Sequence, residues 1–235
     1  MLRNKLSGMA VLALSLTLTS VVMALPKAST AVFDVARNGT SLGYLNSSLK
    51  YPGQTYEYSK NTQSTGLARL LTKASIDEKS AGKFAGERII PISYSYNQKT
   101  RKKNVIDKAR FAGNKASGMY KGNAYTVQTP ANVLDRASLE LAVARDLARN
   151  LPTLQYNVME RGKVKQYVFK RIGNESLTTP AGTFTTVKLS VQRSDKSRKT
   201  TYWMAKELTY LPVKMLHEEG GDVISSVIRE FTIKP

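Results

Sequence analysis

Apolar and polar residues alternate with a period of two in short stretches that recur along the chain from residue 32 onward. In the first of these, Phe33 and Val35 flank Asp34, and the turn signal Asn38-Gly39 follows. The pattern recurs, separated by Gly, Asn, Asp and Pro residues, in the stretches 56–58, 92–96, 163–172, 187–191, 211–215 and 223–233. Because successive side chains of a strand point to opposite faces, the alternation indicates strands with one buried and one solvated face. Antiparallel sheets are typically built this way.

In three of these stretches the sequence also predicts which residues share the core face. They are Ile92, Tyr94 and Tyr96 in the first, Val164, Val168 and Ile172 in the second, and Val223, Val227, Phe231 and Ile233 in the last.

One segment, between Pro130 and Pro152, has a different period. Its apolar residues recur at spacings of three and four, which indicates an amphipathic helix: Leu134, Ala137, Leu141, Ala144, Ala148 and Leu151. We expect a helix over about residues 132–150, with Asn132 or Asp135 as its N-cap. The opposite, polar face carries Arg136, Glu140, Arg145 and Arg149. A single helix among many strands packs on one face of the sheet or plugs a barrel that does not close.

The predicted fold is therefore mainly β, with a curved antiparallel sheet or incomplete barrel and one long amphipathic helix. No internal repeat, low-complexity tract or linker divides the chain after its N-terminal segment. We expect residues 32–235 to form a single β-rich domain. A looser stretch is expected around residues 62–86, where Ser, Thr, Lys and Gly accumulate.

Residues 1–24 have the three parts of a secretory signal peptide: a basic start, an uncharged apolar stretch and small residues at the end. Cleavage is expected after Ala24, with an alternative site after Ala31. A retained N-terminal anchor is a further alternative, since residues 6–25 approach the roughly 20 residues that span a bilayer. No later segment is apolar enough to span a membrane, so we expect no integral membrane segment after cleavage.

The chain contains no cysteine. This excludes a disulfide framework, a thiolate nucleophile, a Cys-based metal site and the lipid attachment of a lipoprotein. The exported domain must be held together by its core alone, and about 205 to 210 residues are enough for that.

The formal net charge is +19, and removal of Arg3 and Lys5 with the signal peptide lowers it to +17. Such an excess favours contact with anionic surfaces, which for an exported protein are lipid head groups, lipopolysaccharide and acidic polymers. The alternative is a solvated basic surface without a specific partner. Nucleic acid is not expected, because the basic residues are spread along the chain and no nucleic-acid recognition motif accompanies them. The only short basic run is Arg101-Lys102-Lys103.

Catalytic signatures are absent from the sequence. The single histidine, His217, is followed by Glu218 and Glu219 and could act as a general base near neutral pH, but the alternative is a surface residue at a strand end. A catalytic His217 would require an acid and a Ser or Thr around it. Ser-x-x-Lys occurs twice, at 47–50 and 80–83, in stretches that do not look like helix starts. With one histidine and no cysteine, any metal site would rest on carboxylates. We expect no enzyme, no catalytic or metal-binding residues, and no cofactor.

Tyrosines are concentrated in the N-terminal half: Tyr44, Tyr51, Tyr56, Tyr58, Tyr94, Tyr96, Tyr120 and Tyr125. On a curved sheet they could line a cavity for an apolar or amphipathic ligand. The alternative is that they are ordinary strand residues of the core.

Several segments in the C-terminal half resemble a known family: 133–138 at the expected helix start, 178–188 around Pro180-Ala181-Gly182, 201–205 around Trp203, and 208–214 around Pro212. In this order they resemble the bacterial envelope family known as domain of unknown function 3108. The resemblance covers about residues 31–234 and is strongest from residue 133 onward. It implies a periplasmic protein of a Gram-negative bacterium with a curved antiparallel sheet and a helix, similar in shape to the half-barrels of lipoprotein carriers. It carries over no catalytic residues.

Within this resemblance, the motif residues are interpreted as structural. We expect Pro180 and Gly182 to form a turn, Trp203 to anchor the core, Pro212 to stand at a strand start or edge, and Asp135 and Ser138 to stand at the helix N-terminus.

The function expected from the sequence is that of a non-enzymatic envelope protein whose concave sheet binds an apolar or lipid-like ligand or an envelope partner. The alternative is a structural or assembly factor that contacts another envelope protein or peptidoglycan through its surface. A lined apolar cavity would favour the first function. A filled core with an exposed apolar patch would favour the second.

Overall fold

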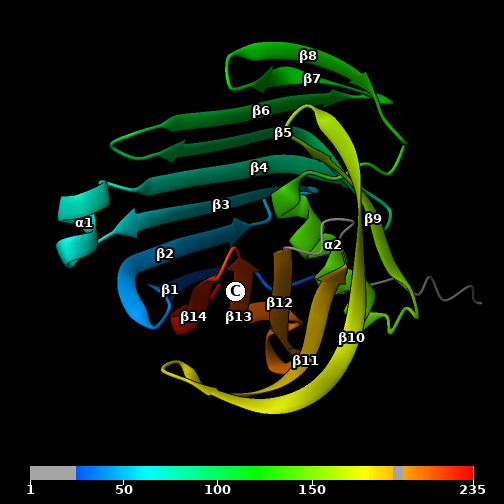
Figure 1. Ribbon diagram of the computed structural model, residues 1–235. Helices are drawn as coiled ribbons and strands as arrows, with labels where there is room; N and C mark the ends of the chain where they lie inside the picture. The colour runs from blue at the N-terminus through cyan, green and yellow to red at the C-terminus, as the bar shows by residue number, and fades with distance from the viewer. Residues whose placement is uncertain (1–24, 193–197, 235) are drawn as a thin grey trace, which may run out of the picture.

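A computed structural model describes residues 25–192 and 198–234, and Figure 1 shows their arrangement. Fourteen strands form one antiparallel sheet in the order β8-β7-β6-β5-β4-β3-β2-β1-β14-β13-β12-β11-β10-β9. Their bounds are β1 Ser29–Arg37, β2 Thr40–Lys50, β3 Thr55–Ser64, β4 Ser75–Ala85, β5 Arg88–Lys99, β6 Asn104–Ala112, β7 Lys115–Tyr120, β8 Asn123–Gln128, β9 Leu154–Glu160, β10 Lys163–Thr179, β11 Gly182–Gln192, β12 Arg198–Ala205, β13 Leu211–Glu219 and β14 Asp222–Ile233. The predicted mainly β fold with an antiparallel sheet is confirmed. The predicted signal peptide, residues 1–24, lies outside the described residues.

The strand order explains the shape of the molecule. The first strand, β1, pairs with the last, β14, so both ends of the described chain lie in the middle of the sheet. The two edges are β8 and β9, which are consecutive along the chain, and in the described sheet they form no ladder with each other. The sheet curls and brings these edges towards each other, and the connection between them, which contains helix α2 (Arg136–Ala148), lies along the open seam (Figure 1). The sheet is thus an incomplete barrel.

Contacts other than a β-ladder hold the seam together. Leu134, just before α2, forms a parallel bridge with Val158 on β9. On the other side, the backbone N–H of Arg161 in the β9–β10 turn donates to Asp107 Oδ2 on β6 at 2.8 Å. A small apolar cluster that includes Val133 and Met159 joins the two sides.

Helix α2 begins where Asp135 caps it, as expected. Asp135 Oδ1 accepts from the backbone N–H groups of Ala137 and Ser138 at 2.9 and 2.8 Å, and the Ser138 hydroxyl accepts from the Asp135 N–H at 2.9 Å. This capping box satisfies backbone donors that the first turn would leave without partners. The expected helix, about 132–150, is longer than the observed one because residues 132–134 lead into the bridge with β9.

The helix is buried on more sides than its sequence pattern predicts. The side chains of Glu140 and Arg145, placed on its polar face, are only 18% and 15% exposed. They are covered because the curled sheet encloses the helix instead of lying along one side of it. Ala137, Leu141 and Ala144 pack in the main core between α2 and the inner face of the sheet.

A second core lies where β10–β14 curl back towards β1. Phe184, Trp203, Val213 and Ile228 are buried in it, and Trp203 is 3% exposed, as expected for a core anchor. The segment 180–181 forms the turn between β10 and β11, and Pro212 is the second residue of β13.

Three β-bulges lie in the strands whose buried faces the alternation predicted wrongly. Ile92 and Ile172 lie at register shifts between β4 and β5 and between β10 and β11, and they are 44% and 50% exposed. Each is an extra residue in its strand, and an extra residue reverses the phase of the alternation. In β14 the extra residue is Arg229. Even-numbered residues such as Ile228 therefore face the core before the bulge, and the odd-numbered Phe231 and Ile233 pack on the same core after it. Val223 therefore lies on the exposed side.

In β10 the buried face is the one opposite to the face that the sequence predicted. Tyr167 and Phe169 are buried, and the predicted Val164 and Val168 are only partly covered.

The expected loose stretch at 62–86 is regular. It contains the end of β3, a short helix α1 (Gly66–Thr72) and β4. A single 3-10 turn, η1 (Lys206–Leu208), precedes β13. In the described part of the chain, no helix has the length and apolar character needed to cross a bilayer.

Candidate ligand cavity between the sheet and helix α2

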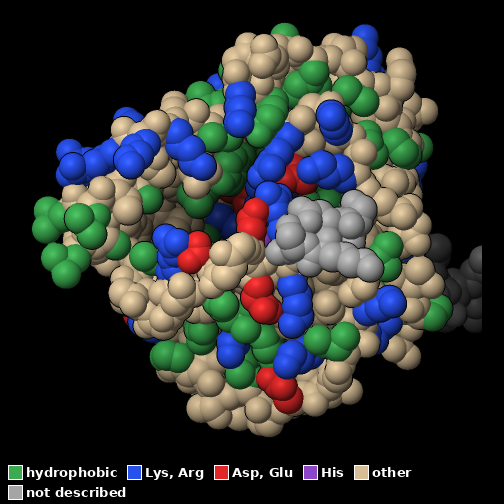
Figure 2. Space-filling model, in the orientation of Figure 1, with side chains coloured by type: hydrophobic (Ala, Val, Ile, Leu, Met, Phe, Trp, Pro, Cys, Tyr) green, Lys and Arg blue, Asp and Glu red, His purple; other side chains and the backbone are tan. Residues whose placement is uncertain are grey.

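A cavity of about 240 Å³ lies inside the curled sheet, beside the N-terminal half of α2. One wall is mostly apolar and comes from the centre of the sheet and from β4: Phe33, Val35, Leu45, Ile76, Tyr202, Pro212, Met215 and Ile224. The other wall comes from β3–β5 and α2 and carries ionisable groups: Tyr58, Lys60, Glu78, Tyr96, Arg136 and Glu140. Figure 2 shows a hollow in the middle of this face, with basic and acidic side chains in and around it. The cavity is therefore amphipathic.

The polar wall is an ion-pair network. Lys60 forms a short ion pair with Glu140 and lies 4.0 Å from Glu78, and Arg136 Nε lies 3.8 Å from Glu78. The hydroxyl of Tyr58 donates to Glu140 at 2.9 Å, and the hydroxyl of Tyr94 donates to Glu78 at 2.7 Å.

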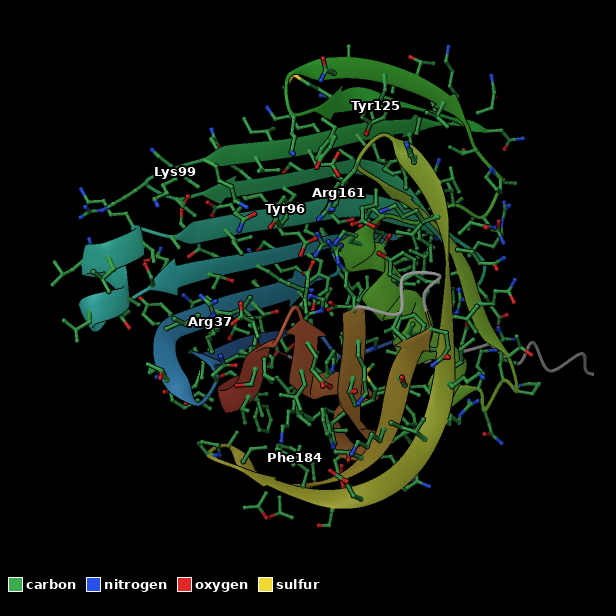
Figure 3. The ribbon with its side chains drawn as sticks, viewed as in Figure 1. Arg37, Tyr96, Lys99, Tyr125, Arg161 and Phe184 are labelled. Atoms are coloured by element: carbon green, nitrogen blue, oxygen red, sulfur yellow. The ribbon has the colours of Figure 1, made fainter. Side chains whose placement is uncertain are left out.

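The guanidinium of Arg136 lies over the ring of Tyr96, with its central carbon 5.1 Å from the ring centroid. Figure 3 labels Tyr96 on β5 and Arg161 at the β9–β10 turn.

The network keeps its members charged despite burial. Burial alone would lower the pKa of Lys60, but the carboxylates of Glu140 and Glu78 outweigh it and hold that pKa above its usual value. Burial alone would raise the pKa of Glu78, but Arg136 and Lys60 outweigh it, so that pKa lies below its usual value. A buried carboxylate or ammonium without such partners would lose its charge.

Asp135, the helix cap, lies directly behind this wall and behaves differently. It is fully buried, and its Oδ2 accepts from the hydroxyl of Ser80 at 2.6 Å. Burial raises the pKa of Asp135 to about 6, because its hydrogen bonds only partly offset the lost hydration. The largest influences on this pKa from the described residues include no cation, in contrast to Glu78, where Arg136 and Lys60 reverse the effect of burial.

A second hollow, of about 730 Å³, lies on the opposite face of β2–β7. Its exposed basic residues are Lys50, Lys79, Lys108 and Arg110, which lie between small serine and alanine side chains, and Glu57 is the acidic residue among them. It is open to solvent, and its lining contains few large apolar groups. It can hold anions at its surface, but it offers no enclosed pocket.

His217 is not isolated: the structure places Thr200 and Glu219 beside it. His217 Nδ1 lies 2.9 Å from Thr200 Oγ1, and His217 Nε2 lies 3.4 Å from Glu219 Oε2. The order of groups is that of a Thr-His-Glu triad. However, Thr200 is only 3% exposed, so a substrate carbonyl has no approach to its hydroxyl, and Glu219 also pairs with Arg198 at 2.6 Å. We interpret the cluster as a cross-strand contact between β12 and β13, which pair Thr200 directly with His217.

The two Ser-x-x-Lys patterns lie on strands, and this geometry separates their members. Ser47 lines the inner cavity, whereas Lys50 is exposed at the outer hollow. Ser80 is buried and bonded to Asp135, whereas Lys83 is exposed. Residues three apart on a strand point to opposite faces, so neither pair can act as a nucleophile and base.

The tyrosines divide between the two interpretations left open by the sequence. Tyr58 and Tyr96 line the cavity. Tyr56 is 0% exposed in the main core, and its hydroxyl lies 3.1 Å from Ser80 Oγ. Tyr51 packs against Phe84, and its hydroxyl donates to Pro26 O at 2.8 Å.

The ionic wall was missed in the sequence. A signal for it exists: Glu78 and Ser80 alternate with the exposed Lys79 and so occupy positions of the buried face of β4. On the helix, Arg136 and Glu140 are four residues apart and so share a face. Within the described residues, no group of three or more His, Cys, Asp and Glu side chains is arranged to hold a metal ion.

Fold and cavity together define an open, barrel-like β-protein with a helix along its seam. The chain belongs to the family described as protein of unknown function DUF3108, whose profile matches residues 32–221. The family resemblance noted in the sequence is thus confirmed.

Among the solved structures similar to this chain are the following two. The first is a beta-barrel-like protein of domain of unknown function DUF1849 from Brucella abortus, with a TM-score of 0.59 and 9% identity over 89% of this chain and 98% of that one. At this identity the likeness concerns the fold alone. The second is described as a "putative lipoprotein" from Parabacteroides distasonis, with a TM-score of 0.39 and 11% identity over 91% of this chain and 100% of that one. No curated protein matches the sequence.

Proposed function

We propose that this protein is a non-enzymatic, periplasmic binding protein of the Gram-negative envelope, and that it holds a single-chain amphiphile in the cavity beside α2. The observation that carries this proposal is the pairing of an apolar wall with a charged wall around one cavity that opens to solvent on one side. An alkyl chain packs against the apolar wall, and a polar head group meets Lys60, Arg136 and their carboxylate partners. The expected signal peptide and the family resemblance support the location.

The size of the cavity limits the ligand. About 240 Å³ lies just below the roughly 300 to 1,000 Å³ of most small-molecule pockets. Such a space accepts one alkyl chain or a small molecule, and it is too small for a two-chain lipid.

The charge of the lining limits the head group. Lys60, Arg136 and Lys214 are the cations, and Glu78 and Glu140 are the carboxylates, so the lining carries one more positive than negative charge. A head group with a single negative charge balances the lining. A cationic head group would add to an existing excess in a poorly hydrated site, where like charges repel strongly. We therefore expect a fatty-acid-like ligand.

The test is native mass spectrometry of the protein purified from the periplasm, followed by calorimetric titration with dodecanoate, dodecanol and dodecyltrimethylammonium. We expect a copurifying amphiphile and the order dodecanoate, dodecanol, dodecyltrimethylammonium for affinity. Ile76→Glu, which places a charge on the apolar wall, should weaken dodecanoate binding at least tenfold. Ile172→Glu is the matched control, because Ile172 is 50% exposed on β10, and it should leave binding unchanged. A protein that carries no amphiphile and binds none of the three would contradict the proposal.

The alternative, an assembly factor that acts through its surface, gains support from one feature. Three leucines of α1 are strongly exposed, as an interaction patch would be. The interior, however, contains an unfilled cavity. An apolar-walled cavity, expected for a binding protein, and an exposed apolar patch, expected for an assembly factor, therefore occur in the same molecule. Loss of amphiphile binding without loss of surface contacts in Ile76→Glu would show that the two functions are separate.

A further inference from the structure

The short helix α1 shows its apolar side to solvent. Leu67, Leu70 and Leu71 are 76%, 66% and 75% exposed, and none of the seven residues of the helix is buried. Spacings of three and four place these leucines on one face, which we call the leucine tip. In Figure 2 a group of apolar side chains stands out at the left end of the molecule, where Figure 1 shows α1 beyond the ends of β2–β4. An apolar helix face is normally turned towards the core.

Backbone hydrogen bonds, and not packing, hold the tip in place. Thr65 N–H donates to Leu42 O at 3.0 Å before the helix, and Arg101 N–H donates to Thr72 O at 2.9 Å after it. The side chain of Arg101 also donates to Leu70 O at 2.5 Å. The leucines therefore contribute little to folding and are available for contact with something else.

Basic residues lie next to the tip (Figure 2). We call them the basic rim: Arg69 and Lys73 on α1, and Lys99, Arg101, Lys102 and Lys103 at the β5–β6 turn. All six are exposed, and the stretches 62–76 and 97–106 that contain them hold no Asp or Glu. Within the described residues, no rim residue forms an ion pair with an acidic side chain. Figure 3 labels Lys99 at the same end of the sheet as α1.

We propose that the leucine tip and the basic rim dock this protein on an anionic phospholipid surface. The leucines enter the boundary between head groups and acyl chains, and the rim contacts lipid phosphates. Charge complementarity favours this occupant: apolar side chains beside lysines and arginines, in stretches that hold no carboxylate, match a surface that is apolar below and negative above. A protein partner would have to present an apolar pocket ringed by acids. This docking is independent of the proposed cavity ligand.

The test is flotation of the protein, as the cell processes it, with vesicles of phosphatidylcholine containing 30% phosphatidylglycerol, compared with pure phosphatidylcholine vesicles. We expect binding to the anionic vesicles that falls steeply between 50 and 500 mM salt, because the rim acts through screened charges. Leu67→Ser/Leu70→Ser/Leu71→Ser should lower the partition coefficient at least tenfold. Lys102→Ser/Lys103→Ser should lower it about 25-fold, since each basic residue near an anionic surface is worth about fivefold.

Matched controls separate the tip from the overall charge. Lys163→Ser/Lys170→Ser on β10 removes the same charge from exposed positions elsewhere and should lower the partition coefficient less than about threefold. Ile172→Ser removes an exposed apolar side chain away from the tip and should have no effect. Far-UV circular dichroism checks that each variant folds.

Three results would overturn the proposal: equal binding of the leucine variant and the wild type, equal losses in the two lysine pairs, or no preference for anionic vesicles. Self-association on size exclusion that the leucine variant abolishes, without vesicle binding, would assign the tip to a second copy of this chain instead.

Discussion

Asp135 gives the sharpest prediction about stability, because a fully buried carboxylate with a pKa of about 6 must weaken the fold at neutral pH. In the unfolded chain the pKa of an aspartate is about 3.9. A group whose pKa is raised by folding contributes stability below its unfolded pKa, and that contribution is lost as the pH rises through the folded pKa. For Asp135 the loss therefore falls between about pH 4 and pH 6.

The magnitude follows from the gap between these two pKa values. About two pKa units, at about 1.4 kcal/mol each, give roughly 3 kcal/mol as the cost of a charged Asp135 above pH 6. Asp135→Asn removes this cost and keeps the cap, since asparagine is as good an N-cap as aspartate. The side-chain oxygen of the asparagine can still accept from the N–H groups of Ala137 and Ser138. Its amide N–H can donate to the Ser80 hydroxyl, which can then donate to the hydroxyl oxygen of Tyr56.

The assay is urea unfolding of the wild type and Asp135→Asn from pH 4 to pH 8 at constant ionic strength. The free energy of unfolding of the variant, relative to wild type, should rise by about 2 kcal/mol between pH 4 and pH 6, rise by less than about 1 kcal/mol more up to pH 7, and stay level above that. Asp34→Asn is the control, because Asp34 is an exposed partner of Arg229 whose ion pair is worth less than about 1 kcal/mol. If the free energy of unfolding of Asp135→Asn relative to wild type does not change with pH, or falls as the pH rises, Asp135 is not a carboxylate whose pKa is raised by burial.

Other predictions concern the ionic wall and the close contacts of the sheet. Lys60→Met should lower the free energy of unfolding by about 3 to 5 kcal/mol, because it leaves the carboxylate of Glu140 without its cation and Glu78 with Arg136 alone. Lys60→Met/Glu140→Leu should recover most of that loss in urea unfolding, and failure to do so would show that the pair is not coupled. Gly82→Ala should cost about 1 to 3 kcal/mol, since a Cβ there would lie 2.4 Å from Ile90 O and 2.5 Å from the Tyr56 ring. Gly113→Ala, where a Cβ meets nothing within 4 Å, should cost only the strain of its positive φ, about 1 kcal/mol; equal costs at both sites would contradict the close contact.

The fold class could be predicted because it rests on local patterns. Alternation at positions such as Phe33 and Val35 and the period of the helix both depend on neighbours along the chain, and the Asp135 cap depends on residues within three positions. A bulge made the prediction wrong at Ile92, because an extra residue in one strand is defined only by its partner strand. Lys60 and Glu140 are 80 residues apart and meet only because the sheet curls around α2. No local pattern in the sequence indicates a contact between residues so far apart along the chain.

The buried charges also bear on why the cavity exists. Replacing a buried ion pair by apolar residues of similar volume is often neutral or stabilising, so Lys60, Glu78, Arg136 and Glu140 are not the most stable way to fill this space. A core selected for stability alone would fill 240 Å³ with leucine or phenylalanine, as the second core does around Phe184 and Trp203. Polar groups kept at such a cost, beside an unfilled apolar wall, are what a ligand with a charged end and an apolar end requires. If Lys60→Met/Glu140→Leu proves as stable as the wild type and still binds dodecanoate equally well, the ion pair serves neither stability nor binding and the ligand lies elsewhere.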